Sequence, residues 1–514
     1  MNRAKKYIIN ALILSACTLL MRTVAVAFNA FCVNKVGSEG MGLFSLVMSV
    51  YTFAVTVATS GVSLASTRLV ALHFGNNKGA SVKSAMRKCL IYSTFFGLAS
   101  SLLLFLFSDF TAIRFLSEPR AAMSIRALSL SLLPLSLCSA FSGYFSAVRR
   151  VYKNAISQVL EQTVKIFSCT FLLSVFLPRG IEYACLALVL GGAVSEVFSF
   201  VIQTLSYLID KRTLSSSGVK VKMRDVMEIS LPVAFSAYVR SGLVTVEHIL
   251  IPIGLAAYGD PNALATYGVV CAVALPIVLY PSAFVGAFSG QVIPEITEFY
   301  AANNKKEVAY VTSRAFFTTL FFSTLCAGMF ATFANDICTV IYGSSEAAEF
   351  LRSLAPLMPI MFLDTVTDSI LKGLGKQFYT MCVNIADAAI SVLFVWLLVP
   401  KIGVYGYIVV IYVSECVNTV FSIGKLTSIV DFKFNIFKMV ISPLICAICA
   451  ANLMHMILSH FAFSLSWISL IFECALYILI YFATARIIGA VGKEEVQWVK
   501  SIWKEKSNAR SEIL

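Results

Sequence analysis

The sequence predicts an all-α polytopic membrane protein with about 14 transmembrane helices, arranged as two parallel six-helix lobes plus two extra C-terminal helices. Three observations predict this fold: the apolar composition, the spacing of the apolar runs, and the placement of lysine and arginine along the chain.

The composition separates the chain from soluble proteins. Of its 514 residues, 59% are hydrophobic and only 13% are charged. A soluble domain is about 45–50% apolar and about 25% charged. The sequence therefore excludes an ordinary soluble enzyme and a disordered protein, and its function must be sought in a membrane.

The apolar residues are grouped in runs long enough to cross a bilayer, for which a helix needs about 20 residues. The runs lie near 7–31, 41–66, 89–108, 121–147, 155–177, 183–208, 226–253, 263–293, 311–334, 350–373, 377–399, 404–427, 436–458 and 464–486. Each run predicts one span, numbered 1–14 here.

Lysine and arginine alternate in density between successive loops. With the N-terminus inside, 30 of the 40 basic residues lie in inside segments and seven in outside segments. This distribution follows the positive-inside rule. It predicts a multi-pass protein of the cytoplasmic membrane with both termini cytoplasmic, and it explains the net charge of +13 without a nucleic-acid partner.

The two halves of the chain repeat each other at an offset of about 219–227 residues. Asn76-Asn77-Lys78 matches Asn303-Asn304-Lys305, and later matches keep the same order. Six helices per repeat is an even number, so both repeats enter the membrane in the same sense, a transporter architecture. The predicted parts are lobes 1–210 and 226–430, a cytoplasmic linker 211–225, helices 13–14 in 431–486, and a cytoplasmic tail 487–514. That tail is either an amphipathic interfacial helix or a frayed polar end.

Polar residues inside the spans of the first half are the first candidates for function, because charge within a bilayer is costly. Arg22 lies near the middle of span 1. One face of span 5 carries Gln158, Glu161, Gln162 and Lys165. This face predicts either the wall of a water-filled cavity or a polar seam between helices.

The second half carries more embedded carboxylates. Span 7 has Arg240 and, two turns on, Glu247. The other acidic and amide candidates lie in spans 10 and 11: Asp364, Asp368, Asn384 and Asp387. This set predicts either a site for Na⁺ or H⁺, or carboxylates that pair internally with Arg240 and loop cations.

Several segments resemble one family of transporters. Residues 36–51 (VGSEGMGLFSLVMSVY), 58–64 (ATSGVSL) and 155–162 (AISQVLEQ) are similar to the stage V sporulation protein B family. That family belongs to the superfamily of multidrug, oligosaccharidyl-lipid and polysaccharide exporters. Locally, Gly37, Gly40 and Gly42 are expected to form a tight outside turn, so these motif residues are interpreted as structural.

The resemblance implies a transporter that flips a polyprenyl-diphosphate-linked oligosaccharide, such as a lipid II-like precursor or a polysaccharide repeat unit, by alternating access. Its partners would be this anionic lipid-linked glycan and the membrane lipids, and no cofactor is expected. By the likeness, Arg22 and Arg240, then Lys165, would bind the diphosphate, beside Glu161, Gln158 and Gln162. A coupling Na⁺ would use Glu247, Asn384 and Asp387, whereas the wider acidic set with Asp364 and Asp368 would suit Na⁺ or H⁺.

Two other functions stay open at this point. A multidrug or cation antiporter of the same superfamily would use the carboxylates of the second half. An integral-membrane glycosyltransferase or polymerase would need a catalytic domain or a large outside loop, and the spacing of the runs leaves little room for either.

Overall fold

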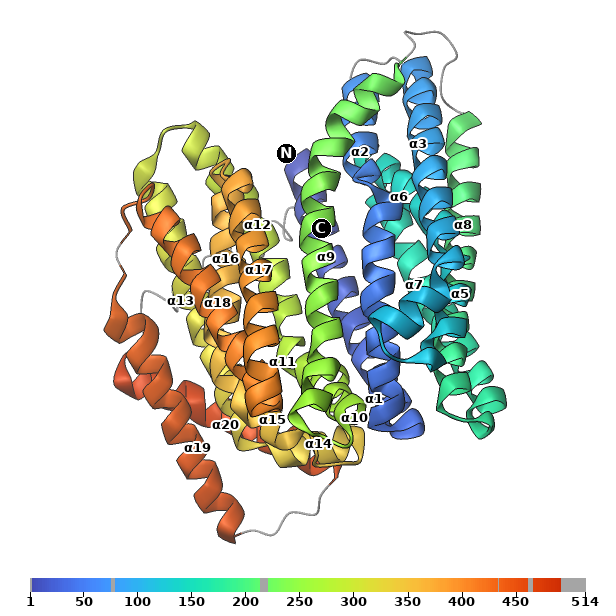
Figure 1. The fold of residues 1–514 in the computed structure, drawn as a ribbon. Helices are drawn as coiled ribbons and strands as arrows, with labels where there is room; N and C mark the ends of the chain where they lie inside the picture. Colours follow the sequence, from blue (N-terminus) through green and yellow to red (C-terminus); the bar gives the residue numbers. More distant parts are fainter. Residues whose placement is uncertain (1, 75–78, 213–220, 433, 461–465, 491–514) are drawn as a thin grey trace. The chain divides into compact units, whose positions relative to one another are not determined.

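The computed structural model describes residues 2–74, 79–212, 221–432, 434–460 and 466–490. Helices make up almost all of this part, and no strand occurs in it, which confirms the all-α prediction (Figure 1). The α-helices are α1 Asn2–Thr59, α2 Val62–Phe74, α3 Gly79–Leu106, α4 Ser108–Phe110, α5 Ala122–Ser129, α6 Leu132–Ala147, α7 Val151–Phe176, α8 Ile181–Arg212, α9 Met223–Tyr258, α10 Ala263–Gly268, α11 Leu275–Leu279, α12 Ser282–Ala301, α13 Lys305–Thr332, α14 Ala334–Tyr342, α15 Ala348–Leu354, α16 Met358–Gly373, α17 Gln377–Ile402, α18 Val404–Thr427, α19 Ser442–His460 and α20 Trp467–Ile488. Short π- or 3₁₀-helical turns lie at Thr111–Phe115, Pro119–Ala121, Leu177–Arg179, Val269–Ala274, Ala355–Leu357 and Phe437–Ile441.

By length and hydropathy, 11 helices among the described residues are able to cross a membrane, or up to 13 if each of two bent pairs forms one span. The first of the 11 covers 54 residues, Leu20–His73. At 1.5 Å per residue it measures about 80 Å, against a hydrocarbon core of about 30 Å. It is broken at Gly37, whose φ of 80° is outside the helical region. The count of fourteen spans stays a prediction.

Two compact units make up the chain. The first contains the described parts of 1–30, 273–383 and 411–514, and the second contains those of 31–272 and 384–410. The two lobes predicted from the sequence repeat, 1–210 and 226–430, stay a prediction. The proposed amphipathic tail lies outside the described residues from 491 onward, as does most of the linker.

The second unit is held together by small residues at its helix crossings. Helices α2, α3 and α6 pack against one another, and α7 lies along α8 (Figure 1). A Cβ at Gly143 would lie 2.4 Å from the Ser63 carbonyl oxygen, so the backbones of α6 and α2 approach too closely to admit a side chain there. Ser93 and Ser136 donate hydrogen bonds to backbone carbonyls on neighbouring helices. Close packing and hydrogen bonds of this kind hold the helices together, because the hydrophobic effect does not drive helix association inside lipid.

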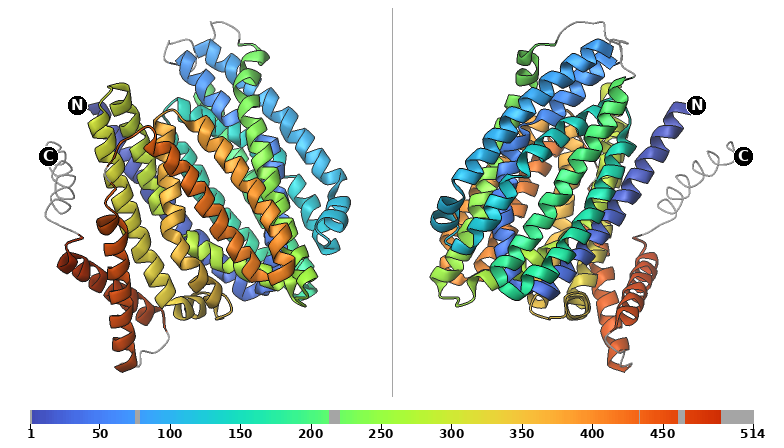
Figure 2. Two further views of the ribbon diagram at one scale, coloured as in Figure 1. Left: turned by 60° about the vertical axis from the view of Figure 1, so that its left-hand side comes forward. Right: turned by 90° about the vertical axis from the view of Figure 1, so that its right-hand side faces the viewer.

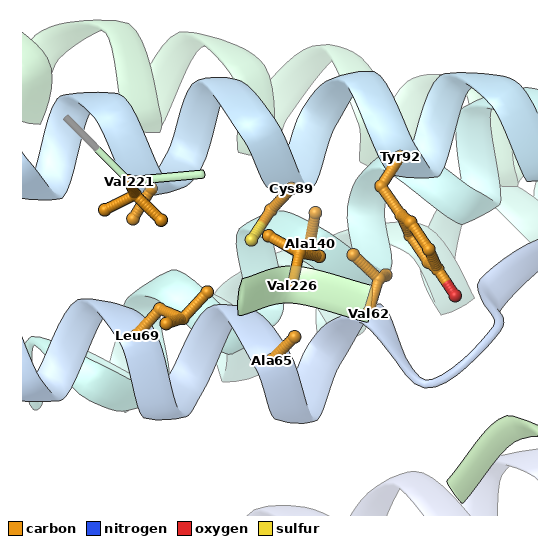
Figure 3. Close-up of a cluster of buried hydrophobic side chains, with 9 residues drawn as sticks. Val62, Ala65, Leu69, Cys89, Tyr92, Ala140, Val221 and Val226 are labelled. Atoms are coloured by element: carbon orange, nitrogen blue, oxygen red, sulfur yellow. The ribbon is translucent and has the colours of Figure 1, made fainter. Parts of the chain in front are cut away.

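An apolar cluster closes this unit toward the predicted cytoplasmic end. It joins Val62 and Leu69 of α2 to Tyr92 of α3 and Val226 of α9 (Figure 3). Figure 3 also shows Val221, from the segment before α9, directed at the same cluster. The start of α9 is therefore fixed to α2 and α3, about four turns before Arg240.

The first unit is organised around α13, which packs against α16 and α19. Helix α20, shown with α19 in red in Figure 2, is anchored by two fully buried tyrosines. Tyr477 donates a hydrogen bond to the Ala447 carbonyl of α19 at 3.1 Å, and Tyr481 donates one to the Phe321 carbonyl of α13 at 3.0 Å. Hydrogen bonds thus join α20 to α19 and to α13 within this unit.

Candidate transport site

Helix α7 presents the polar face that the sequence predicts in span 5. Gln158 is exposed, and Glu161, Gln162 and Lys165 are partly exposed. Most of α7 is exposed or only half-buried in the chain, because it packs mainly along α8. The polar face is therefore open to its surroundings in this unit, and a set of polar side chains is costly against lipid.

The buried edge of the same face meets α8. Ser157 lies 3.1 Å from Ser199, oxygen to oxygen. Glu161 also lies beside Ser199 and is close enough to Lys165, one helical turn on, to interact with it electrostatically. The structure thus shows features of both interpretations of this face, a polar seam along α8 and an open polar wall.

Tyr51 and Glu196 form a contact that sequence reasoning did not include among the site residues. The Tyr51 hydroxyl donates a hydrogen bond of 2.6 Å to the Glu196 carboxylate. Tyr51 lies on α1 and Glu196 on α8, 145 residues apart. A tyrosine in an apolar span carries no signal of such a partner, so only the packing reveals it.

Arg22 lies in the first unit, where its guanidinium donates a hydrogen bond of 2.9 Å to the Leu279 carbonyl. Leu279 ends α11, and the chain bends before α12 begins at Ser282. The carbonyls at the end of a helix lack helical donors and carry partial negative charge, so a cation is favourable there. One nitrogen of Arg22 is used in this way.

Arg240 lies on α9 in the second unit and is exposed. It forms no ion pair with any residue that the structure describes. Glu247 is two turns away on the same helix, a rise of about 10 Å, so the two side chains start too far apart for a close pair. Among the described residues, Arg240 therefore does not pair with the carboxylates of the second half, which was the alternative to a cation site.

Glu247 lies close enough to Asp387 of α17 to interact electrostatically, and both belong to the second unit. The next residue, His248, places its Nδ1 3.0 Å from the Tyr267 hydroxyl. Asn384 lies one turn before Asp387 on α17. The structure thus brings Glu247 and Asp387, two of the predicted coupling residues, near each other.

Asp364 and Asp368 lie on α16 and belong to the first unit, whereas Glu247 and Asp387 belong to the second. Asp368 is buried and lies 3.7 Å from the Lys372 ammonium, one turn further along. Ser422 donates to the same carboxylate at 3.5 Å. Lys372 thus offsets part of the charge of Asp368, an internal pairing with a basic residue at a helix end of the kind that the sequence left open.

Comparison with known protein families decides the class of this chain. The polysaccharide biosynthesis protein family matches residues 8–299, more than half of the sequence. The chain belongs to this family. The MatE family matches residues 238–397, in the second half.

Relatives of established name support the same class. Stage V sporulation protein B of Bacillus subtilis (strain 168) is 24% identical over 85% of this chain and 87% of its own length. Lipid II flippase MurJ of the same organism is 25% identical over 67% of this chain and 69% of its own length. The resemblance to the stage V sporulation protein B family is confirmed.

Solved structures show the same fold. Lipid II flippase MurJ in an inward closed conformation has a TM-score of 0.71 at 14% identity, covering 93% of this chain and 99% of that one. An inward-facing multidrug resistance MATE family transporter of the MOP superfamily has a TM-score of 0.63 at 14% identity, covering 80% and 98%. This polysaccharide biosynthesis family member is a multi-pass membrane transporter of the flippase and exporter kind, and not a glycosyltransferase or polymerase.

Proposed function

We propose that this transporter moves a polyprenyl-diphosphate-linked oligosaccharide, a lipid II-like precursor or a polysaccharide repeat unit, across the cytoplasmic membrane by alternating access. The observation that carries the proposal is the placement of three cations, Arg22, Lys165 and Arg240, inside membrane spans. All the other lysines and arginines lie in predicted loops and helix ends. An intramembrane cation needs a partner, and a diphosphate supplies one.

The state of the three cations suits this role. Arg240 has no ion-pair partner among the described residues, and Arg22 uses one nitrogen on a backbone carbonyl. Arginine presents several donors in a planar fork, so the remaining donors of Arg22 are suited to a phosphate. Lys165 and the amides Gln158 and Gln162 share one polar face of α7, where the amides would bond sugar hydroxyls.

The membrane potential favours this direction of transport. With both termini in the cytoplasm, as the basic loops indicate, the substrate head enters from the inside. Moving one negative charge outward across an inside-negative membrane gains about 2.3 kcal/mol per 100 mV. An anionic diphosphate is therefore driven in the proposed direction without a further energy source.

A multidrug or cation antiporter is the second candidate. It is favoured by the match of the MatE family to residues 238–397 and by the proximity of Glu247 and Asp387. In this function the two carboxylates, with Asn384, would bind Na⁺ or H⁺ as the coupling ion, and Asp364 and Asp368 would add to the acidic set. Arg240, on the same helix as Glu247, disfavours a cationic drug nearby.

The test is rescue of a bacterium depleted of its own lipid II flippase, scored by lipid II exposed on the outer face. We expect rescue by the wild-type chain and its loss in Arg22→Ala and Arg240→Ala. Arg224→Ala is the matched control for Arg240, because Arg224 lies on the same helix, is exposed, and forms an ion pair with Glu228 one turn away. Flipping at the wild-type rate by both site variants, at equal membrane levels, would sink the diphosphate site. Absence of rescue by the wild-type chain would instead favour another lipid-linked glycan or the antiporter.

A further inference from the structure

A chain of short hydrogen bonds runs through the interior of the second unit. It starts at the Glu196 carboxylate of α8 and passes to the Tyr51 hydroxyl at 2.6 Å. It continues from Tyr51 to the Ser131 hydroxyl, also at 2.6 Å, and ends at the Leu128 carbonyl, 2.9 Å from the serine oxygen. Tyr51 is 4% exposed and Ser131 is 0% exposed, so their bonds do not compete with water.

The two hydroxyls allow this chain to satisfy either protonation state of Glu196. With the carboxylate ionised, Tyr51 donates to Glu196 and Ser131 donates to Tyr51. With the carboxyl protonated, Glu196 donates to Tyr51, Tyr51 donates to Ser131, and Ser131 donates to the Leu128 carbonyl. Each hydroxyl has one proton and can also accept, so the Glu196–Tyr51 and Tyr51–Ser131 bonds are made in both states, whereas the bond from Ser131 to the Leu128 carbonyl is made only when the carboxyl is protonated. The two states differ by one proton and by hydroxyl rotations, with no movement of heavy atoms.

The surroundings of Glu196 contain few other charges. Glu161 and Lys165 of α7 are close enough to interact with it electrostatically, and Cys138 of α6 is the remaining titratable neighbour besides Tyr51. Two carboxylates face one ammonium, so the group carries one excess negative charge when both carboxylates are ionised. Uptake of one proton makes it neutral, which removes the cost of an excess charge in a low-dielectric interior.

A path for the proton follows from the same contacts. Glu161 and Lys165 are partly exposed on the open polar face of α7, and Gln158 on that face is exposed. Glu196 therefore lies between the polar face of α7 and a buried hydrogen-bond chain.

We propose that Glu196 is a proton-binding site of the transport cycle, which takes up and releases one proton through the polar face of α7. The proposal rests on the transport function proposed above and deepens it, because it assigns proton exchange to the first half of the chain. It is independent of the glycan and of the acidic set around Glu247. Protonation would change the charge presented beside Lys165, which is a candidate substrate contact.

The first test needs no substrate. Infrared difference spectra of the purified full-length protein in lipid nanodiscs are recorded as the pH is changed, and the C=O band of protonated carboxyl groups is followed. All Asp and Glu residues contribute to this band, so we expect the difference between wild-type and Glu196→Gln spectra to show one titrating component that the variant lacks. Glu182→Gln is the matched control, because Glu182 lies in the first turn of the same helix, and it should keep this component. An unchanged band in Glu196→Gln, or no titrating band in the wild type, would overturn the proposal.

Two further variants keep the test valid if Glu196→Gln fails to fold. Tyr51→Phe and Ser131→Ala each break the chain at a different bond while leaving the carboxyl in place. A hydrogen bond to a charged group contributes about 1.5–3 kcal/mol, so Tyr51→Phe should move the midpoint of the band by about one pH unit or more. Ser131→Ala should move it by less. Midpoints identical to the wild type in both variants would show that the chain does not govern this proton.

Transport is then measured separately, as flipping at several external pH values. The proposal expects the pH dependence of the wild type to be lost in Glu196→Gln and kept in Glu182→Gln. If the infrared titration assigns the proton to Glu196 but no lipid II is flipped, the substrate is wrong and the proton site stands. If lipid II is flipped with the same pH dependence in Glu196→Gln, the proton site is wrong and the substrate stands.

Discussion

Replacing Gly42 with alanine adds one methyl group at the closest approach of two helices in the second unit. A Cβ at Gly42 would lie 2.1 Å from the carbonyl oxygen of Leu264 on α10. The reverse contact is equally tight, because a Cβ at Gly268 would lie 2.1 Å from the Ser38 carbonyl oxygen. The obstacles are backbone atoms, so no side-chain rotation relieves them.

The size of the effect follows from these distances. Ordinary contact of a Cβ begins at 3.4 Å, so the atoms must separate by about 1.3 Å. Overpacking of this kind costs about 1–3 kcal/mol of the free energy of unfolding. One separation of the two helices would relieve both clashes, so the double variant of Gly42 and Gly268 should cost clearly less than the sum of the two single variants.

The assay is equilibrium unfolding in mixed detergent micelles, with flipping measured on the same variants. Gly192→Ala is the matched control, because Gly192 lies within α8 and a Cβ there meets nothing within 4 Å. Alanine is the better helix former by about 1 kcal/mol, so this control should be neutral or slightly stabilising. Wild-type stability in Gly42→Ala, or full additivity in the double variant, would refute the backbone contact.

Two further predictions concern buried polar anchors. Tyr481→Phe removes the hydrogen bond to the Phe321 carbonyl and should cost about 1 kcal/mol of the free energy of unfolding, measured in the same micelles; no loss would show that packing alone holds α20. Asp210→Asn should cost about 3 kcal/mol, because the buried Asp210 carboxylate receives both Arg150 and Lys153. Lys153→Met should cost less, because Arg150 still pairs with Asp210. Thermal unfolding of the two variants is compared side by side. A lower unfolding temperature for Lys153→Met than for Asp210→Asn would contradict this prediction.

The sequence predicted the transporter class and the all-α fold, because both depend on local composition. Apolar runs, basic loops and the family motifs are each visible without knowing what packs against what. The glycine motif shows where this reasoning stops. Gly37, Gly40 and Gly42 were expected to share one turn, but only Gly37 has a positive φ, and Gly42 lies within the helix at a crossing with α10.

The candidate site residues show the same difference between features visible in the sequence and contacts set by packing. The sequence located Arg22, Lys165 and Arg240, because a charge inside an apolar run is conspicuous and costly. It did not reveal that Arg22 caps the end of α11, or that Lys372 lies beside Asp368. In the first case the partner is a backbone carbonyl 257 residues away, an atom that every residue carries.

The sequence by itself determined that this chain crosses the membrane many times, belongs with the flippases and exporters, and carries three intramembrane cations. Only the tertiary structure decided that Glu196, Tyr51 and Ser131 form one reversible hydrogen-bond chain. The physical reason is that hydropathy and charge are properties of single residues and short windows. A hydrogen bond depends on the position of two atoms within a few tenths of an ångström, which helix packing sets.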